Sequence, residues 1–235
     1  MANVEIDGVN SKVYTDQVDP KTGTTLTLGT SGDTVNLGSG VTAGTGFGGD
    51  LSFGGDTFGA DKTVGANDAY AFTLETSGNP AIKMDALGHV TKPLQPCVLV
   101  RNGSAQTDIA VDTDTTIEFD TERFDQNADF NTGTYTFTAP VTGRYLISSV
   151  VVLNQLDTSA TYYRTRIVTS NYSYKHSIWD PDYYDADHSY WTVAATVIAD
   201  MDASDTAYID FRQAGGTAQT DTIANDCTFS IGLFA

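Results

Sequence analysis

The densest group of side chains able to do chemistry lies in one short segment, Trp179 to Trp191, which reads WDPDYYDADHSYW. Its carboxylates are the hard oxygen ligands that calcium prefers, and its flat aromatic rings suit stacking on sugars or packing against protein. The spacing does not follow an EF-hand loop. The segment therefore has three alternative interpretations: recognition of a glycan or protein, calcium binding, or a solvated acidic loop whose aromatic residues pack on a neighbouring subunit. The candidate ligand-binding residues are Trp179, Asp180, Asp182, Tyr183, Tyr184, Asp185, Asp187 and Trp191, and the candidate calcium ligands are Asp180, Asp182, Asp185 and Asp187.

Other reactive residues form no catalytic pattern. Asp112 and Asp114 indicate a turn rather than a metal site. No Gly-x-Ser-x-Gly elbow is present, and the scattered histidines and cysteines lack zinc-site spacing. Because the chain has 30 acidic residues, a pair of carboxylates suited to glycoside hydrolysis arises by chance and carries no weight. We expect no enzymatic activity and no cofactor other than the calcium of the second interpretation. The residues concerned are His89, His176, His188, Cys97 and Cys227.

The two cysteines, Cys97 and Cys227, both lie in apolar segments typical of strands. Two cysteines are too few for a small secreted scaffold held together by disulfides. The expectation is two buried thiols, with one disulfide left open as the alternative.

The net charge of −18 excludes several classes of partner. Nucleic-acid binding requires a basic face that displaces counterions from phosphates, and an anionic membrane surface would repel this chain. No apolar run approaches the ~20 residues of a membrane-spanning helix, so no membrane insertion is expected. The first residues, MANVEIDGVNSKVYTDQ, lack the basic and apolar regions of a secretory signal. We expect synthesis in a cytoplasm without export by the usual route.

Composition and periodicity predict an all-β protein. The chain contains 22 glycines and much Thr, Asp and Ser, and it lacks apolar runs at helical spacing. About eight strands in the last 140 or so residues suit a two-sheet jelly roll, with Val193, Val197, Ile198, Tyr208, Ile209 and Phe211 in its inner layer. The expected strands are Cys97–Arg101, Thr116–Phe119, Gly133–Phe137, Gly143–Leu153, Tyr162–Ser170, Tyr190–Asp200, Thr206–Gln213 and Cys227–Phe234.

The chain divides by composition near residue 93, which predicts an arm, residues 1–92, and a jelly-roll head, residues 93–235. The arm is rich in Gly and Thr, repeats Phe-Gly-Gly-Asp within Phe47–Phe58, and ends in a predicted hairpin formed by Tyr70–Glu75 and Ala81–Asp85. Such an arm cannot bury enough surface to fold alone. It is expected to be held by partner chains or by a larger particle, and to serve in trimerisation and attachment.

A family resemblance lies in the stretch FDTERFDQNADFNTGTYTFTAPVTGRYLIS, Phe119 to Ser148. It resembles the signature of the complement C-one-q globular-head family, which shares the tumour-necrosis-factor-like jelly roll. The closing segment CTFSIGLFA is similar to the last strand of that family, and MDASDTAYIDF resembles the turn before the penultimate strand, with Ser204 where a glycine is usual. The positions that match the signature are Phe119, Phe124, Asn131, Gly133, Phe137, Pro140, Gly143 and Tyr145.

The resemblance implies a homotrimer and says nothing of complement function, because no collagen-like Gly-x-y run is present. The arm segments VDPKTGTTLTLGTSGDTV and NPAIKMDALGHVTKP resemble short modules of bacteriophage fibre and virion proteins. The leading hypothesis is a structural virion protein: a trimeric tail fibre, spike, head fibre or capsid decoration whose head contacts the host surface and whose arm binds other virion proteins. The alternatives are a free binding module of the complement-head type and a glycan-cleaving tail spike.

Overall fold

The structure is a computed structural model that describes Gly65 and residues 68–235. These residues form β-strands and one 3-10 turn, η1, and they contain no α-helix, which confirms the all-β prediction. The elements are β1 (Phe72–Thr76), β2 (Asn79–Met84), β3 (Val90–Thr91), β4 (Cys97–Arg101), β5 (Thr115–Thr116), β6 (Thr121–Asp125), β7 (Phe130–Asn131), β8 (Thr136–Thr138), β9 (Gly143–Leu156), β10 (Ala160–Thr169), β11 (Ser173–Trp179), η1 (Pro181–Tyr183), β12 (His188–Met201), β13 (Thr206–Gly215), β14 (Asp221–Thr222) and β15 (Thr228–Leu233).

A small antiparallel sheet, β1–β2–β3, comes first along the described chain. Ser77 and Gly78 connect β1 to β2 with φ angles of 52° and 75°, the left-handed geometry that a two-residue hairpin turn needs. The predicted hairpin is therefore confirmed. The predicted repeat within Phe47–Phe58 lies outside the described residues, and the domain boundary at residue 93 stays a prediction.

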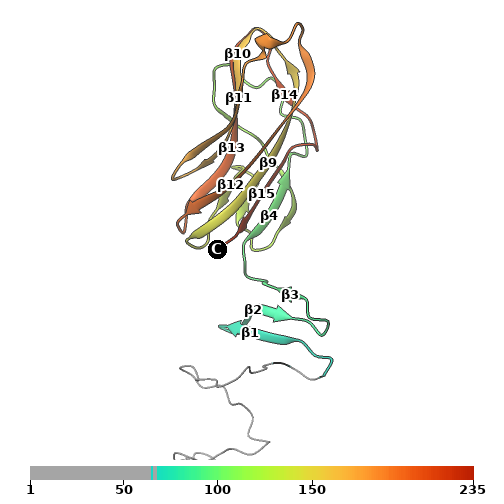
Figure 1. The fold of residues 1–235 in the computed structure, drawn as a ribbon, viewed down its shortest axis with the longest axis vertical. Helices are drawn as coiled ribbons and strands as arrows, with labels where there is room; N and C mark the ends of the chain where they lie inside the picture. The colour runs from blue at the N-terminus through green and yellow to red at the C-terminus, as the bar shows by residue number, and fades with distance from the viewer. Residues whose placement is uncertain (1–64, 66–67) are drawn as a thin grey trace, which may run out of the picture. The chain divides into compact units, whose positions relative to one another are not determined.

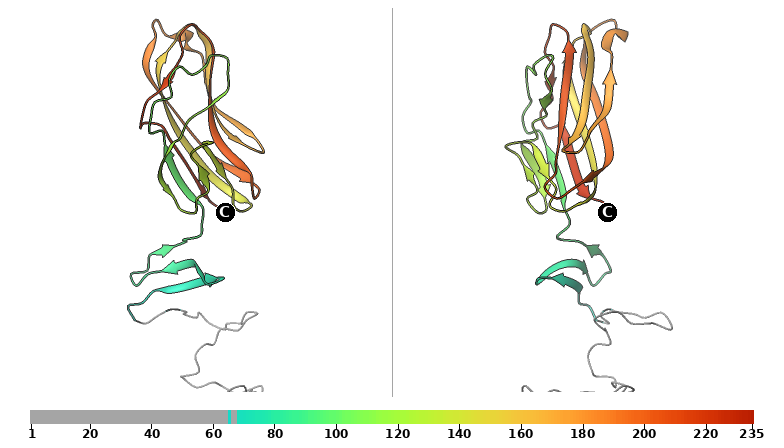
Figure 2. Two further views of the ribbon diagram at one scale, coloured as in Figure 1. Left: turned by 180° about the vertical axis from the view of Figure 1, so that it is seen from behind. Right: turned by 90° about the vertical axis from the view of Figure 1, so that its left-hand side faces the viewer.

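The rest of the described chain is a jelly-roll sandwich. One sheet has the order β12–β9–β15–β4–β6, and the other has the order β11–β10–β13–β8–β7 (Figures 1 and 2). The chain changes sheet between β4 and β5, β5 and β6, β6 and β7, β8 and β9, β9 and β10, β11 and β12, β12 and β13, and β13 and β14. Its first and last strands, β4 and β15, pair side by side. This Greek-key path closes two antiparallel sheets over one core.

Strand β9 shows how side chains are divided between core and surface. Tyr145, Ile147 and Ser149 alternate inward and are buried, whereas Leu146 is exposed on the outer face, as the period of two requires. The glycine at the start of this strand permits close packing: a Cβ on Gly143 would lie 2.7 Å from Leu233 Cδ1 and 2.8 Å from the Ala235 carbonyl oxygen. The chain end at Leu233 and Ala235 therefore leaves no room for a side chain at this position.

Some expected positions are wrong, and alternation explains why. Ile209 and Phe211 are buried, so Tyr208, one residue before Ile209, faces outward and is only half-buried. On β12, Val193 is buried but Ile198 is 49% exposed. The predicted strand Thr116–Phe119 is reduced to β5, and Gly133–Phe137 begins only at Thr136. Strands β3, β6, β7, β11 and β14 were not predicted.

The two ends of the sandwich differ in what they carry. The chain enters at Cys97, which pairs with Gly232, and the last residue, Ala235, accepts a hydrogen bond from the Arg144 N–H at 2.7 Å. We call this the arm end. The 14-residue strand β9 starts here and spans about 45 Å, so its other terminus lies at the opposite end (Figure 1). That end, called the apical end below, carries the loops 157–159, 180–187 and 216–220.

The junction between the small sheet and β4 is fixed to the arm end by side-chain amides. The Gln126 Nε2 group donates to the carbonyl oxygens of Lys92, Pro93 and Gln95 at 3.0, 3.0 and 2.7 Å. Both prolines of this junction lack a backbone donor, so the hydrogen bonds that Gln126 donates to its carbonyl oxygens help to hold it.

Candidate functional site

Three loops are tied together at the apical end by two aspartates. Asp187 Oδ1 accepts hydrogen bonds from the Thr158 N–H at 2.7 Å and its hydroxyl at 2.8 Å, which joins the loop after η1 to the loop after β9. Asp157 accepts from the N–H groups of Ser159 and Ala218, both at 2.8 Å, and from that of Thr217. Burial by itself raises the pKa of Asp157, but these hydrogen bonds outweigh it and lower the pKa well below its usual value.

The predicted segment folds into a capped turn. Asp180 is the N-cap of η1, and its carboxylate accepts a hydrogen bond from the Asp182 N–H at 2.9 Å. Pro181 follows as the first residue of the turn and is buried, while the Tyr184 N–H closes the turn on the Pro181 carbonyl at 2.9 Å. The local Asp-Pro pair therefore fixes where the exposed rings of this segment begin.

An aromatic ladder connects this segment to the core. Its members are Phe211, Tyr163, Trp179, Trp191 and Tyr184. Successive ring centroids lie 6.0, 4.6, 4.8 and 5.7 Å apart, within the usual range for aromatic pairs. Exposure increases along it: Phe211 and Tyr163 are buried, and Trp179, Trp191 and Tyr184 are half-buried. Beyond the ladder Tyr183 is 90% exposed, so it alone among the predicted aromatic residues presents its whole ring to solvent.

The four predicted calcium ligands do not come together as a metal site. Asp180 caps η1, Asp187 holds Thr158, and the side chains of Asp182 and Asp185 are exposed. Among residues 68–235 no group of three or more His, Cys, Asp or Glu side chains is placed to hold a metal ion. Two of the four carboxylates accept backbone hydrogen bonds instead, and calcium binding by this set stays a prediction. Recognition by the aromatic residues stays a prediction.

A hollow of about 290 Å³ lies beside the ladder at the apical end. Its walls come from the last residues of β9 and the first of β12, which pair as Asn154 with Tyr190 and Leu156 with His188. We call it the apical hollow. The polar residues that line it are Asn154, Gln155, Asp187, His188 and Ser189.

A larger hollow, of about 590 Å³, lies at the arm end and includes Asp129, Pro140 and Ser204. Burial, followed by the charge of Asp125, raises the pKa of Asp129, and one oxygen of this carboxylate has no hydrogen-bond partner. Because this hollow lies at the end where the chain enters, it does not share the apical loops.

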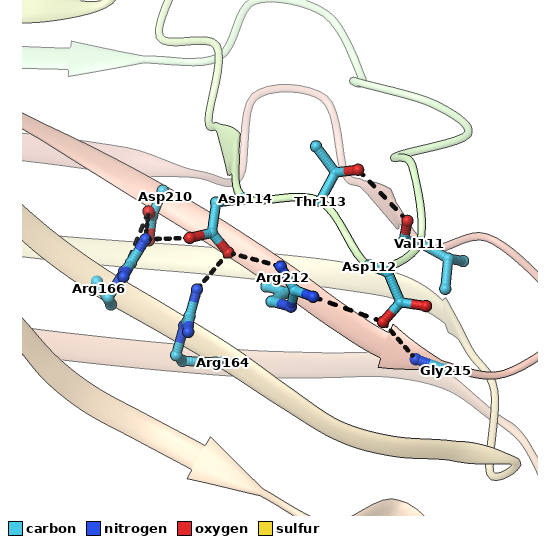
Figure 3. Close-up of polar contacts among 9 residues, drawn as sticks. All are labelled: Val111, Asp112, Thr113, Asp114, Arg164, Arg166, Asp210, Arg212 and Gly215. Atoms are coloured by element: carbon cyan, nitrogen blue, oxygen red, sulfur yellow. Dashed lines mark hydrogen bonds and ion pairs between the residues drawn. The ribbon is translucent and has the colours of Figure 1, made fainter.

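The outer face of the other sheet carries a charge network that sequence reasoning missed. Asp114 accepts from Arg166 at 2.6 Å and from Arg212 at 3.3 Å, and it also binds Arg164 (Figure 3). Asp210, whose side chain is 4% exposed, binds Arg166 through both carboxylate oxygens. Burial alone raises the pKa of Asp114, but the arginines lower it overall. Asp114 therefore joins the segment before β5 to strands β10 and β13.

The sequence offered a partial signal for this network. Arg164 and Arg166 alternate on one strand and Asp210 and Arg212 on another, so each pair faces one side of the sheet. Register was the unknown: only the pairing of Arg164 with Arg212 and of Arg166 with Asp210 brings them together. The expectation that Asp112 and Asp114 form a turn was incomplete.

The outer face of the first sheet has almost no charge. From β12 across β9 and β15 to β4, its outward side chains are Thr192, Ala194, Thr196 and Ile198, then Leu146, Ser148 and Val150, then Thr228, Ser230 and Gly232, then Cys97 and Leu99. We call this set the uncharged face. Its charged margin includes Arg144 and Asp200, 4.0 Å apart at the arm end, and Arg101 of β4, which pairs with Thr228. Leu146 and Ile198 pair directly and are 43% and 49% exposed.

The cysteines differ from expectation. Cys227 is buried, and burial raises the pKa of its thiol, but Cys97 is exposed. Both are free, and they lie at opposite ends of the β4–β15 pairing, too far apart for a disulfide. The expectation of two buried thiols is thus wrong for Cys97, whose position on β4 turns it to the outer face. Of the histidines, His89 binds Asp85 at 2.8 Å in the small sheet, and His188 lies at the apical hollow.

Comparison with known proteins gives structural likenesses only. No family model matches the chain, and no curated protein matches its sequence. The globular domain of a zebrafish complement 1qA protein is 16% identical with a TM-score of 0.44, over 60% of this chain and 98% of that one. Murine APRIL is 9% identical with a TM-score of 0.42, over 60% of this chain and 99% of that one. In residues 68–235 no helix is long and apolar enough to cross a membrane.

Proposed function

We propose that this protein is the non-enzymatic, homotrimeric head of a bacteriophage virion structure, either a fibre or spike or a capsid decoration, and that its apical end contacts the host surface. The observation that carries the proposal is the uncharged face. In a chain with a net charge of −18, a broad sheet surface without charge needs a reason.

Self-association supplies that reason. Like-charged copies repel, so a contact between them requires surfaces free of charge. The uncharged face offers exposed Leu146 and Ile198 side by side with short hydroxyl side chains that hydrogen-bond one another, as Thr196 does to Ser148 at 3.1 Å. Apolar area without a covering element favours burial against another copy. The segment from Phe119 to Ser148 resembles a family whose members form trimers, and this resemblance supports three copies.

The two ends of the sandwich support an orientation. The chain reaches β4 at the arm end, so an arm that binds a virion leaves the apical end directed outward. The apical end is also where Tyr183 and Tyr184 stand exposed or half-exposed on a rigid ladder. Aromatic rings that cost little conformational entropy to order are typical of recognition surfaces. This arrangement favours host contact by the loops between β11 and β12.

The virion assignment rests on the likeness of the arm to phage fibre modules, and purification tests it. The protein should co-purify with particles in multiples of three copies. A truncated protein without the arm, residues 1–92, should be absent from the particles. A free binding module of the complement-head type would instead appear in clarified lysate with no particle association.

The trimer has its own test. Sedimentation equilibrium of the full chain should give three times the single-chain mass of 25.1 kDa. A well-folded single molecule at micromolar concentration would overturn the proposal, because the uncharged face would then be a solvated surface.

A further inference from the structure

The apical hollow has a polar lining whose hydrogen-bonding capacity is largely uncommitted. No hydrogen bond among the described residues uses the side-chain amide of Asn154 or the hydroxyl of Ser189. The Gln155 Nε2 group donates to Asp221 at 2.5 Å, which leaves its carbonyl oxygen free. Asp187 accepts from Thr158 through Oδ1 only. The hollow therefore presents donors and acceptors next to one another with few internal partners.

The backbone at this hollow is also held in an unfavourable conformation. Gln155 has a φ of 61°, in the left-handed region that a residue with a Cβ adopts only at an energetic cost. The pairing of β9 with β12 continues in register past this residue, with His188 opposite Leu156 and Tyr190 opposite Asn154. Such local strain is retained where surrounding structure imposes it, and it is common at binding sites. Here it turns two amide side chains toward the same hollow.

Aromatic surface borders the polar groups. His188 contacts Tyr184 with ring centroids 4.3 Å apart, and Tyr184 in turn lies against Trp191 at 5.7 Å. Tyr190, which pairs with Asn154, is 68% exposed. The hollow is thus continuous with the exposed end of the ladder. Flat apolar rings next to amide, imidazole, hydroxyl and carboxylate groups are the complement of a sugar, which has apolar faces and a rim of vicinal hydroxyls.

We infer that the apical hollow binds a neutral sugar residue, with hydroxyl groups held by Asn154, Gln155, Asp187, His188 and Ser189. This rests on the proposed host contact and names its ligand class. The volume of about 290 Å³ is near the lower limit of small-molecule pockets and suits one ring rather than an extended chain. Acidic sugars and phosphates are disfavoured, because Asp187 lines the hollow and Asp221 binds its Gln155, with no lysine or arginine in the lining.

The test measures binding of free monosaccharides to the full-length protein by ligand-observed NMR and calorimetry. The probes are glucose, galactose and N-acetylglucosamine, with N-acetylneuraminic acid as the acidic comparison. At least one neutral sugar should bind in the millimolar range and the acidic sugar should bind at least tenfold more weakly. Asn154→Ala and His188→Ala should each weaken binding at least tenfold. Thr132→Ala, in the hollow at the arm end, is the matched control and should bind as the wild type does.

Each remaining outcome bears on one hypothesis. Absence of binding by all three neutral sugars, equal binding of the acidic sugar, or unchanged binding by a folded Asn154→Ala variant would overturn the sugar site. If particles carrying Asn154→Ala adsorb normally and no sugar binds, the sugar site fails while host contact by the apical end stands. If wild-type protein neither adsorbs to cells nor associates with particles, the proposed function fails, whatever the sugars do.

Discussion

Trp179 stacks on Trp191, with ring centroids 4.8 Å apart and 29° between the ring planes. The two residues are the first and last of the segment that the sequence singled out, so this contact closes the base of the apical loop. Trp179 also stacks on buried Tyr163 at 4.6 Å. Part of the aromatic group is therefore structural, and only part is available for binding.

Substitutions in the ladder should separate these two roles. Trp191→Ala should lower the free energy of unfolding by about 2 kcal/mol, less than the 3–5 of a fully buried tryptophan because Trp191 is half-buried. Tyr183→Ala should leave it unchanged within about 0.5 kcal/mol, since Tyr183 is 90% exposed, yet reduce adsorption to susceptible cells. Urea unfolding and an adsorption assay measure the two effects. Normal adsorption of Tyr183→Ala would place host contact elsewhere.

The charge network on the other sheet gives a graded prediction. Asp210→Asn should destabilise the protein by about 3 kcal/mol, because its side chain is 4% exposed and Arg166 would lose a buried partner. Asp114→Asn should cost about 1–2 kcal/mol, reduced by solvent because that side chain is 39% exposed. Asp112→Asn is the control: it is 64% exposed and 3.6 Å from Arg212, so it should cost under about 0.5 kcal/mol. If urea unfolding ranks the three losses of stability in another order, burial of the carboxylate does not determine how much each aspartate contributes.

Acid should weaken the apical end through Asp157. Its pKa in the folded protein lies below the usual value of 3.8, so the unfolded chain binds the proton more readily. The stability that Asp157 contributes is complete above about pH 4 and is lost as the pH falls below that value. Asp157→Asn removes this dependence, and urea unfolding at pH 6 and pH 3 should therefore show a smaller loss for the variant. Protonation at low pH also reduces charge repulsion in the folded protein. This effect is nearly equal in the wild type and the variant, so it cancels when their losses of stability are compared. Equal losses would show that Asp157 is not the titrating group.

The long strands could be predicted from sequence because their pattern is regular. Cys97–Arg101 matches β4 in full, and Gly143–Leu153 lies within β9. Both have β-branched or aromatic residues at most inward positions: Val98 and Val100 in the first, and Tyr145, Ile147 and Val151 in the second. The strand Ser173–Trp179 was missed because SYKHSIW alternates poorly, and its order depends on pairing with β10. Tyr135 was predicted to lie in a strand, but its φ of 59° belongs to a turn. Alternation of polar and apolar residues does not predict such a backbone conformation.

The candidate site was predictable only in part for a related reason. Residues adjacent in sequence, such as Trp179 to Trp191, can be recognised as a group. Asn154 and Gln155 join His188 only through the register of β9 against β12, and no local pattern fixes that register. The aspartates illustrate the opposite case. Their clustering in sequence indicated a metal, but capping of η1 and the bond to Thr158 use two of the four.

The uncharged face yields a direct prediction about assembly. Leu146→Glu introduces a charge next to exposed Ile198, so it should convert the proposed trimer into folded single chains. Thr161→Glu, an exposed position on β10 in the other sheet, adds the same charge away from that face and should leave the trimer intact. Sedimentation measures the mass, and circular dichroism checks the fold. A trimeric Leu146→Glu variant would show that another surface joins the copies.

Cys97 provides an independent probe of the same face. It is exposed in the single chain and lies on the uncharged face opposite Gly232, whereas Cys227 is buried with a raised thiol pKa. A thiol reagent reacts with the accessible thiolate, so the proposed trimer should react slowly at both cysteines. The Leu146→Glu single chain should react quickly at one, and the unfolded chain at both. The reagent reports on solvent access at one known atom, the sulfur of Cys97. If Cys97 reacts quickly while the mass is that of three chains, the uncharged face is not the contact between the copies.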